Sequence, residues 1–326
     1  MKEVLVDAGV PTARHGTFTE ADPAFAFLDT LDGLYVVKTD GLAAGKGVVV
    51  TTSIDEARDA VREYLSGAAF GDAGRTLVIE EGLTGPELSV LAVCDGTRAV
   101  ALAPAQDFKR IGDGDAGPNT GGMGAYSPVP VADASVIDAV MRDGVEPTLA
   151  ELRRLGIDYR GVLYAGLMLT PAGPKMLEYN VRFGDPETQV VLPRFTSDLG
   201  ELLAAAAAGS IGAAPTFDDG AAVTVVCAAE GYPRDVRTGD VIEGLEAARS
   251  VPGATVFCAG VGADADGALI TAGGRVLTVT GQGATIAAAR QTAYDAVACI
   301  SWPGMQHRND IASAAIAAQG AQGGTR

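Results

Sequence analysis

Hydrophobic and polar positions along the chain follow two different periods, which together predict a mixed α+β fold. With 326 residues, the chain is long enough for two or three subdomains that each bury a core. Apolar residues at helical spacing predict helices over residues 1–8, 23–31, 53–66, 133–155 and 283–300. Short apolar runs rich in β-branched residues predict strands over residues 35–38, 48–52, 76–81, 88–94, 162–170 and 175–181.

Three stretches interrupt this pattern. Residues 104–130 are rich in Gly, Asp and Pro and contain few apolar residues, which is typical of a functional or disordered loop. The linker 213–220 predicts a boundary between a domain over 1–212 and a smaller α+β domain over 213–311. Residues 312–326 are predicted to form a disordered tail.

Charge and hydropathy exclude several classes of protein. No apolar run reaches the roughly 20 residues that a membrane-spanning helix needs. The first residues show no export signal, so we expect a cytoplasmic protein that has no membrane partner. A net charge of −17 argues against a nucleic-acid partner, because such binding needs concentrated Lys and Arg. A few local basic residues could still bind a small phosphorylated substrate.

The cysteines and histidines limit the metal chemistry. The four cysteines lie far apart without a CxxC pair, so we expect them to be buried structural thiols: Cys94, Cys227, Cys258 and Cys299. Only His15 and His307 are present, which makes a histidine-rich zinc site improbable. Any metal must therefore be held by oxygen ligands, which suits Mg²⁺.

The glycine-rich segment 41–47, GLAAGKG, lies between two predicted strands. It is not a P-loop, because its spacing is too short and Gly47 occupies the position of the metal-binding Ser or Thr. We predict a flap over about residues 33–80, whose Gly45, Lys46 and Gly47 close over nucleotide phosphates while Lys38 approaches from the strand. The alternative is an ordinary loop with solvated lysines.

Carboxylates gather around the turn in VIEEGLTGPELSV. Glu80 and Glu81 end one strand, and Glu87 begins the next. They could accept hydrogen bonds from an adenine amino group and from ribose hydroxyls. The alternative is a set of acidic caps on a surface turn.

The segment MLEYNVRFGDPE predicts a metal site. Strand alternation places Met176, Glu178, Asn180 and Arg182 on one face, and an oily set of Leu177, Tyr179 and Val181 on the other. Glu178 and Asn180 can supply hard oxygen ligands to Mg²⁺, and Arg182 can stabilise transferred negative charge. The alternative is a half-exposed strand whose polar face lies in water.

The loop AQDFKRIGDGDAGPNTGGMGAYSP combines positive charge with unobstructed backbone amides, as phosphate or carboxylate binding requires. A mobile surface loop is the alternative. Its candidate substrate-binding residues are Lys109, Arg110, Asn119, Thr120 and Gly121.

These motifs together resemble one family. KTDGLAAGKGVVV, VIEE with GPE, DFKR with GPNTGGMGAYSP, and EYNVRFGDPETQ stand in the order and at the separations found in phosphoribosylamine–glycine ligases, over almost the whole chain. The resemblance implies an ATP-grasp fold, in which two α+β subdomains enclose ATP, and a C-terminal α+β domain.

The same resemblance implies roles for individual residues. Lys38 and Lys46 would contact the ATP phosphates, with Arg182 and Lys46 the catalytic residues. Glu80, Glu81 and Leu83 would surround adenine, Glu87 would hold the ribose, and Glu178 and Asn180 would bind Mg²⁺ or Mn²⁺. The residues that would face the acyl phosphate and substrates are Arg182, Asp185, Asp107, Lys109, Asn119 and Thr120.

The implied reaction belongs to purine synthesis and has two steps. The carboxylate of glycine attacks the γ-phosphate of ATP and gives glycyl phosphate and ADP. The amine of 5-phosphoribosylamine then attacks the glycyl carbonyl and gives glycinamide ribonucleotide and phosphate. Such chemistry needs positioning and charge neutralisation more than a protein nucleophile.

The sequence departs from the family pattern in two places. The family's N-terminal domain with its GxGGRE segment is not found before Met1, so a nucleotide-binding remnant without full ligase activity is the alternative function. Gly82 stands where the family has an aromatic ring beside adenine, which removes apolar contact worth on the order of 1 kcal/mol.

Overall fold

The computed structural model describes residues 1–41, 47–69 and 71–323, which divide into two units. Unit 1 comprises Met1–Pro86 and Leu167–Leu177, and unit 2 comprises Glu87–Gly166 and Glu178–Arg326. The chain passes from one unit to the other between Pro86 and Glu87, within β11 (Arg160–Thr170) and within β12 (Gly173–Asn180). The predicted boundary at 213–220 stays a prediction.

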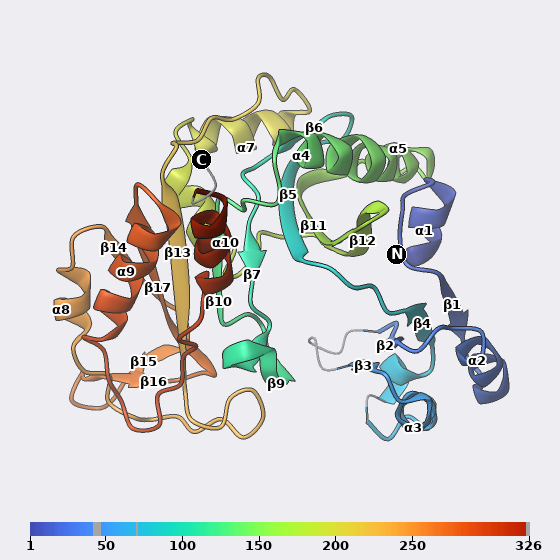
Figure 1. The fold of residues 1–326 in the computed structure, drawn as a ribbon, viewed down its shortest axis with the longest axis horizontal. Helices are drawn as coiled ribbons and strands as arrows, with labels where there is room; N and C mark the ends of the chain where they lie inside the picture. Colours follow the sequence, from blue (N-terminus) through green and yellow to red (C-terminus); the bar gives the residue numbers. More distant parts are fainter. Residues whose placement is uncertain (42–46, 70, 324–326) are drawn as a thin grey trace. The chain divides into compact units, whose positions relative to one another are not determined.

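Unit 1 is built around an antiparallel sheet with the strand order β1-β4-β2-β3 (Figure 1). Helices α2 and α3 pack on this sheet, and the core contains Leu28, Val37, Val61, Leu77 and Ile79. The elements of unit 1 are α1 (Lys2–Asp7), β1 (His15–Phe18), α2 (Ala21–Leu28), β2 (Tyr35–Thr39), β3 (Val48–Thr51), α3 (Ile54–Leu65), the 3-10 turn Gly71–Gly74 and β4 (Leu77–Glu81).

The start of α3 follows from local chemistry. The Ser53 hydroxyl accepts a hydrogen bond from the Glu56 amide, as an N-cap does. The Glu56 carboxylate accepts from Thr51 instead of returning to the Ser53 amide, which itself donates to the Thr51 hydroxyl. Of the two hydrogen bonds that make a capping box, only the one from the Glu56 amide to the Ser53 hydroxyl is therefore present.

Unit 2 contains a five-stranded sheet in the order β14-β17-β13-β10-β7, and the strands β5 and β6 of a second sheet in the order β12-β11-β5-β6. Strand β13 (Ala221–Ala228) is buried along its whole length, and α9 (Ile286–Val297) packs on the five-stranded sheet. The other strands are β5 (Glu87–Asp95), β6 (Ala99–Ala101), β7 (Gln106–Asp107), β8 (Arg110–Gly112), β9 (Ala116–Asn119), β10 (Gly124–Ser127), β14 (Ala254–Cys258), β15 (Val261–Ala263), β16 (Leu269–Thr271) and β17 (Arg275–Gly283).

The helices of unit 2 include the predicted long helical stretch at 133–155. It consists of α4 (Ala134–Val140), a π-helical turn (Met141–Val145) and α5 (Glu146–Arg154). The remaining helical elements are the 3-10 turns Asp113–Asp115 and Leu192–Arg194, and α6 (Thr188–Val191), α7 (Leu199–Ala208), α8 (Leu245–Arg249) and α10 (Ser313–Gly323).

Two segments differ from the sequence-based expectation. Residues 104–130 are not a continuous irregular loop, since β7 and β10 pair within the five-stranded sheet and β8 pairs with β9. These segments carry no strand signal in the sequence because β7, β8 and β9 have no buried residue, and the buried β10 has the sequence GAYS without a β-branched residue. Residues 313–323, predicted to be part of a disordered tail, form α10, whose alanine-rich sequence has high helix propensity.

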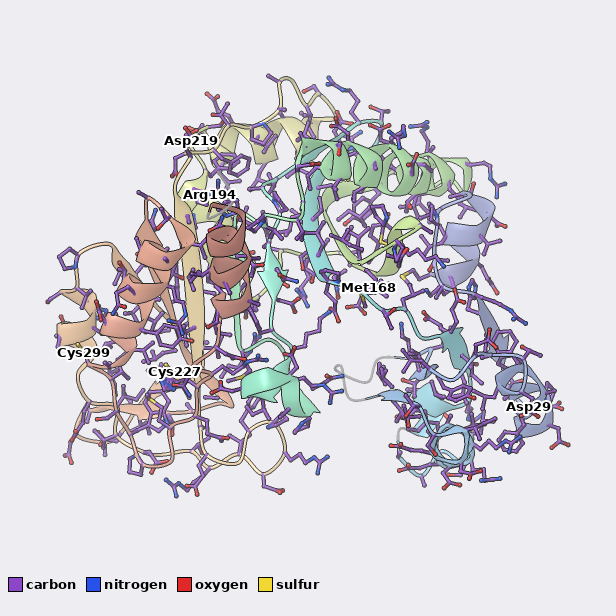
Figure 2. All side chains as sticks on the ribbon, in the orientation of Figure 1. Asp29, Met168, Arg194, Asp219, Cys227 and Cys299 are labelled. Carbon is purple, nitrogen blue, oxygen red and sulfur yellow. The ribbon has the colours of Figure 1, made fainter. Side chains whose placement is uncertain are left out.

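The cysteines are only partly as expected. Cys94 and Cys227 are buried, but Cys258 and Cys299 are exposed. Cys227 and Cys299 are labelled in Figure 2. The prediction was wrong for Cys258 because β14 is the edge strand of its sheet, and for Cys299 because it lies beyond the end of α9. No helix within the described ranges is long and apolar enough to cross a membrane.

The contact between α9 and β17 depends on a glycine. A Cβ atom at Gly281 would lie 2.3 Å from the Ala293 nitrogen and 2.4 Å from the Ala289 oxygen, and backbone atoms cannot move aside as a flexible side chain can. We predict that Gly281→Ala lowers the free energy of unfolding by about 2–3 kcal/mol, as overpacking does. Urea unfolding followed by circular dichroism measures it. Gly212→Ala is the matched control, because nothing lies within 4 Å of its added Cβ. Equal midpoints for the two variants would contradict the packing argument.

Candidate active site

The predicted nucleotide residues of unit 1 centre on a buried carboxylate. Glu80 is 2% exposed, and its Oε1 lies 2.9 Å from Lys38 Nζ while its Oε2 lies 3.0 Å from Lys2 Nζ. Lys38 is brought there by the antiparallel pairing of β2 with β4, in which Val36 is the partner of Glu80. Two ammonium groups around one carboxylate leave a net charge of +1.

The two lysines differ in access to solvent. The Lys38 side chain is 22% exposed, whereas that of Lys2 is 4% exposed and donates a hydrogen bond to Thr12 Oγ1 at 2.6 Å. Thr12 Oγ1 in turn donates to the Met176 carbonyl. Lys2 is therefore fixed within unit 1, while Lys38 can also meet a ligand.

The neighbouring carboxylate, Glu81, has different partners. It accepts hydrogen bonds from the Arg14 amide at 3.0 Å and from Lys175 Nζ at 3.2 Å. The hydrogen bond from the Arg14 backbone is the main cause that holds the pKa of Glu81 below its ordinary value. Half-buried Leu83 follows two residues after β4.

The absent aromatic ring at Gly82 has a local explanation. A Cβ atom at Gly82 would lie 2.0 Å from Leu34 Cγ, so the Leu34 side chain already occupies the space that a larger residue would use. The substitution is thus accompanied by apolar packing from another part of unit 1.

The glycine-rich flap is described only at its edges. Gly45 and Lys46 lie outside the described residues. Gly47 is buried, and its carbonyl accepts a hydrogen bond from the Thr39 amide at 2.9 Å, next to the pairing of β2 with β3. The two strands predicted on either side of GLAAGKG are confirmed as β2 and β3.

In unit 2 the predicted Lys109 and Glu87 form an ion pair, with Asp107 close by. The pKa of Asp107 is raised to about 7, and burial is the largest cause. The charge of Lys109 lowers this pKa, while the carboxylates of Glu187 and Glu87 raise it. Burial would lower the pKa of Lys109, but the charges of Asp107 and Glu87 outweigh it and raise the pKa. Lys109 is therefore a permanent cation among acidic groups.

Glu187 was not predicted from the sequence. It is 3% exposed and accepts a hydrogen bond from the Tyr164 hydroxyl at 2.9 Å, and Tyr164 lies 2.8 Å from the Ser89 hydroxyl. Burial is the main cause that raises the pKa of Tyr164. The only signal was its place in RFGDPETQ, since neither periodicity nor a charged neighbour marks it.

The strand predicted to carry the metal-binding residues is β12, and it extends as far as Asn180. Glu178 and Asn180 are alternate residues of β12 and so share a face. The strand ends there, so the alternation does not extend to Arg182, whose guanidinium donates to the Phe183 carbonyl at 2.8 Å. The prediction of an oily face through Val181 was wrong, because Val181 lies beyond the strand and is 72% exposed.

The predicted substrate loop, residues 105–128, is held by its own backbone and by one arginine that the sequence did not predict, Arg275. Both the amide and the hydroxyl of Thr120 donate to the Lys109 carbonyl, and Arg110 pairs with Asn119 between β8 and β9. Arg275 donates to the Gly121 carbonyl at 2.8 Å and to Asp185 Oδ2 at 2.9 Å. Arg275 therefore brings Gly121 and Asp185 together within unit 2.

The two proposed metal-binding residues, Glu178 and Asn180, suit a metal ion that is also coordinated by a bound substrate. A group of three or more His, Cys, Asp or Glu side chains able to hold a metal ion is not found among residues 1–41, 47–69 and 71–323. One carboxylate and one amide oxygen are what Mg²⁺ uses when phosphates and water complete its shell.

Comparison with known proteins gives the family. Residues 1–188 match the model of the phosphoribosylglycinamide synthetase ATP-grasp (A) domain, and residues 222–314 match that of the phosphoribosylglycinamide synthetase C domain. The chain is 50% identical over 319 residues to the phosphoribosylamine–glycine ligase of Xanthomonas campestris, covering 97% of this chain and 73% of that protein. It belongs to the phosphoribosylamine–glycine ligase family. The ATP-grasp fold and the family expected from the motifs are thereby confirmed.

Other relatives agree with this membership. The phosphoribosylamine–glycine ligase of Streptomyces coelicolor is 50% identical over 321 residues, covering 97% of this chain and 74% of that protein. The crystal structure of the phosphoribosylamine–glycine ligase of Thermotoga maritima has a TM-score of 0.85 at 36% identity, covering 95% of this chain and 77% of that one. A biotin carboxylase domain from Hydrogenobacter thermophilus, at 17% identity and a TM-score of 0.70, shares the fold alone, covering 94% of this chain and 66% of that one.

The raised pKa of Asp107 gives a prediction for Glu187. Replacing Glu187 by Gln removes a negative charge that disfavours ionised Asp107, so the pKa of Asp107 falls below about 7. Carboxyl-detected NMR of protein labelled at aspartate, titrated in metal-free buffer, measures the pKa. Glu201→Gln, an exposed position on α7 of the same unit, should leave it unchanged. An unchanged pKa in Glu187→Gln would show that Glu187 does not act on Asp107.

Proposed function

We propose that this chain ligates glycine to 5-phosphoribosylamine at the expense of ATP, giving glycinamide ribonucleotide, ADP and phosphate, as a step of purine synthesis in the cytoplasm. The observation that carries the proposal is the identity of about half over 97% of the chain to phosphoribosylamine–glycine ligases. The charge pattern of the two units supports it, because each carries lysines held by carboxylates at predicted ligand positions.

For the nucleotide, we assign Lys38 to the ATP phosphates, together with Lys46 and the amides of Gly45 and Gly47. The net charge of +1 around Glu80 supports Lys38 in this role, because the buried Lys2 offsets the carboxylate that would otherwise neutralise Lys38. Glu80, Glu81 and Leu83 are assigned to the surroundings of adenine, and Glu87 to the ribose. The Glu80 side chain is already in contact with two lysines, so we assign its adenine contact to the backbone.

For the metal, Glu178 and Asn180 would hold Mg²⁺ or Mn²⁺. The bound ion would neutralise phosphate charge during transfer. The chain's own residues supply the rest of the positive charge, with Lys109 kept protonated by Asp107 and Glu87 and with Arg182 exposed directly after the metal strand.

For the two organic substrates, we assign residues around the β8–β9 hairpin and the end of β12. Lys109 and Arg182 would orient the glycine carboxylate and the acyl phosphate made from it. Asp107 has a pKa near 7, so it could accept the proton that the attacking amine loses. The residues assigned to binding the substrates are Asp107, Lys109, Arg110, Asn119, Thr120, Gly121 and Asp185.

The proposal is tested by product formation. Purified protein is supplied with Mg-ATP, glycine and freshly formed 5-phosphoribosylamine, and ADP and glycinamide ribonucleotide are both quantified. We expect equal amounts of the two products and little ADP when either glycine or the amine is left out. ADP release that needs no amine would favour the alternative, a nucleotide-binding protein without full ligase activity.

The metal assignment predicts a selective defect. Glu178→Gln keeps the shape of the side chain but removes its charge, so the affinity for Mg-ATP should fall by about tenfold or more while the unfolding midpoint changes little. Isothermal titration with a non-hydrolysable ATP analogue at several Mg²⁺ concentrations measures it. Glu201→Gln is the control of the same chemistry. Unchanged Mg-ATP affinity in Glu178→Gln would remove Glu178 from the metal role.

The lysine pair around Glu80 predicts that the buried Lys2 affects the affinity for ATP. Lys2→Met removes one of the two positive charges, so Lys38 is neutralised by Glu80 and affinity for the ATP analogue should fall by about tenfold. The same titration measures it. Arg58→Met, which breaks the more exposed ion pair with Asp29 in unit 1, should bind as the parent does. Parent-like affinity in Lys2→Met would refute the charge argument.

A further inference from the structure

The most deeply buried charged side chain outside the proposed site is Arg308 of unit 2. It is 1% exposed, although it is an arginine in an irregular segment near the end of the chain. A buried guanidinium is stable only where its donors are satisfied. The hydrogen-bond partners of Arg308 therefore indicate which segments it connects.

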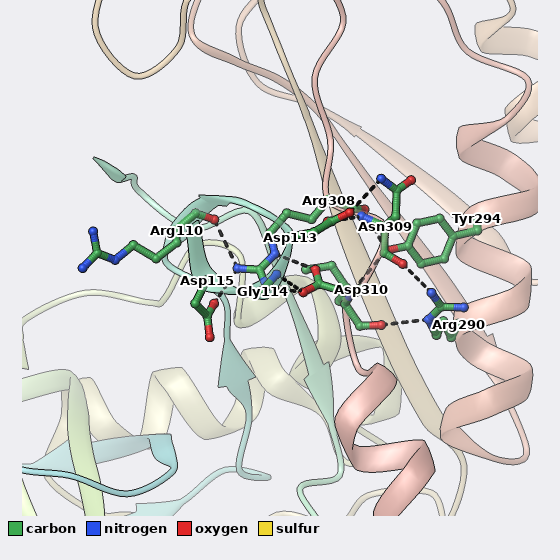
Figure 3. A network of polar contacts seen from close by, with 10 residues as sticks. Arg110, Asp113, Gly114, Asp115, Arg290, Tyr294, Arg308, Asn309 and Asp310 are labelled. Carbon is green, nitrogen blue, oxygen red and sulfur yellow. Dashed lines mark hydrogen bonds and ion pairs between the residues drawn. The ribbon is translucent and has the colours of Figure 1, made fainter. Parts of the chain in front are cut away.

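On one side, Arg308 is bound by Asp310, two residues later in the chain. Its Nε and Nη2 donate to the two oxygens of Asp310, each at 2.7 Å, in a bidentate pair. Helix α9 fixes the backbone of this segment, because the Tyr294 hydroxyl donates to the Arg308 carbonyl and Arg290 donates to the Ile311 carbonyl (Figure 3). Asp310 thus orients the guanidinium, and α9 holds the backbone that carries it.

The other side of Arg308 meets the substrate loop. Nη1 donates to Asp115 Oδ1 at 2.6 Å and to the Arg110 carbonyl at 3.3 Å (Figure 3). The guanidinium also lies over the Phe108 ring, 4.8 Å from its centroid. Phe108 and Arg110 are the residues directly before and after Lys109. Arg308 therefore contacts the residues on both sides of the lysine, through the Phe108 ring and the Arg110 carbonyl.

Neighbours of Arg308 reinforce the same contact. Asp113 accepts from both the amide and the side-chain nitrogen of Asn309, at 2.7 and 3.0 Å, and the Gly114 amide donates to Asp310 Oδ2 at 2.8 Å. Asp115 has a positive φ of 54°, a conformation that costs a non-glycine residue free energy, so contacts from outside the turn help to stabilise it. The segment 308–310 supplies them.

We infer that Arg308 is a positioning residue for Lys109, which it orients through Phe108 and Arg110 without touching substrate itself. This inference rests on the proposed function, because it is Lys109 that is assigned to the substrates. Holding the Phe108 ring and the Arg110 carbonyl keeps the ammonium group of Lys109 on Glu87 and beside Asp107. Loosening Arg308 should release Lys109 from that position.

The test measures Lys109 directly. The protein is treated briefly with acetic anhydride, and acylation of each lysine is quantified by mass spectrometry. Lys109 and Lys175 are a matched pair, because both are bound to a glutamate and their side chains are 34% and 28% exposed. Arg308→Lys keeps the charge but loses the planar fork, so it should raise Lys109 acylation by about tenfold, as expected for losing a charged hydrogen bond, and leave Lys175 unchanged.

Two further variants make the result specific. Asp115→Asn weakens the contact from the loop side at a side chain that is 70% exposed, so it should fold normally and also raise Lys109 acylation. Arg237→Lys, at an arginine of unit 2 held by Asp240 and the Pro303 carbonyl, is the control and should change neither lysine. Unchanged Lys109 acylation in Asp115→Asn and in folded Arg308→Lys would overturn the inference, and Asp115→Asn alone decides if Arg308→Lys does not fold.

Kinetics separate this inference from the proposed function. In Arg308→Lys the KM for glycine or 5-phosphoribosylamine should rise, while the affinity for the ATP analogue stays that of the parent. A parent protein that forms no glycinamide ribonucleotide would refute the proposed function, yet the acylation result would still decide whether Arg308 positions Lys109. Normal ligase turnover with unchanged acylation would refute the positioning role alone.

Discussion

The constraint on which the candidate site depends is that a carboxylate removed from water must be compensated by positive charge. Glu80, at 2% exposure, meets this constraint with two lysines from separate parts of unit 1. One lysine, Lys2, is buried and structural, and the other, Lys38, stays accessible. The excess positive charge makes unit 1 able to attract phosphate while Glu80 holds the lysine in place.

The candidate site residues of unit 2 have an excess of negative charge instead. Lys109 lies beside Glu87 and Asp107, so acidic groups outnumber the lysine. Burial, together with the carboxylates of Glu187 and Glu87, raises the pKa of Asp107 to about 7. A surplus of acidic oxygens is suited to a bound cation and to accepting a proton. The position of Lys109 in turn depends on Arg308, which is satisfied by Asp310 and Asp115.

Sequence patterns predicted those features of the fold and the site that depend on residues close together in the chain. Strand alternation placed Glu178 and Asn180 on one face, but it could not show that β12 ends at Asn180, because the next residues retain strand-like composition. The roles of Lys2 and Arg308 were out of reach for a different reason. Their partners are distant in sequence, with Arg308 and Asp115 separated by 193 positions, so only the folded chain brings them together.

The central claim, that the chain activates glycine as an acyl phosphate and passes it to an amine, is tested most directly by isotope transfer. Glycine labelled with 18O in its carboxylate is supplied with Mg-ATP and 5-phosphoribosylamine, and the released phosphate is analysed by mass spectrometry. When the amine displaces phosphate from glycyl phosphate, one carboxylate oxygen leaves with the phosphate. The account predicts one glycine-derived 18O in each phosphate, in an amount equal to the glycinamide ribonucleotide formed. Phosphate without the label would mean that water, not glycine, attacks ATP, and would contradict the account.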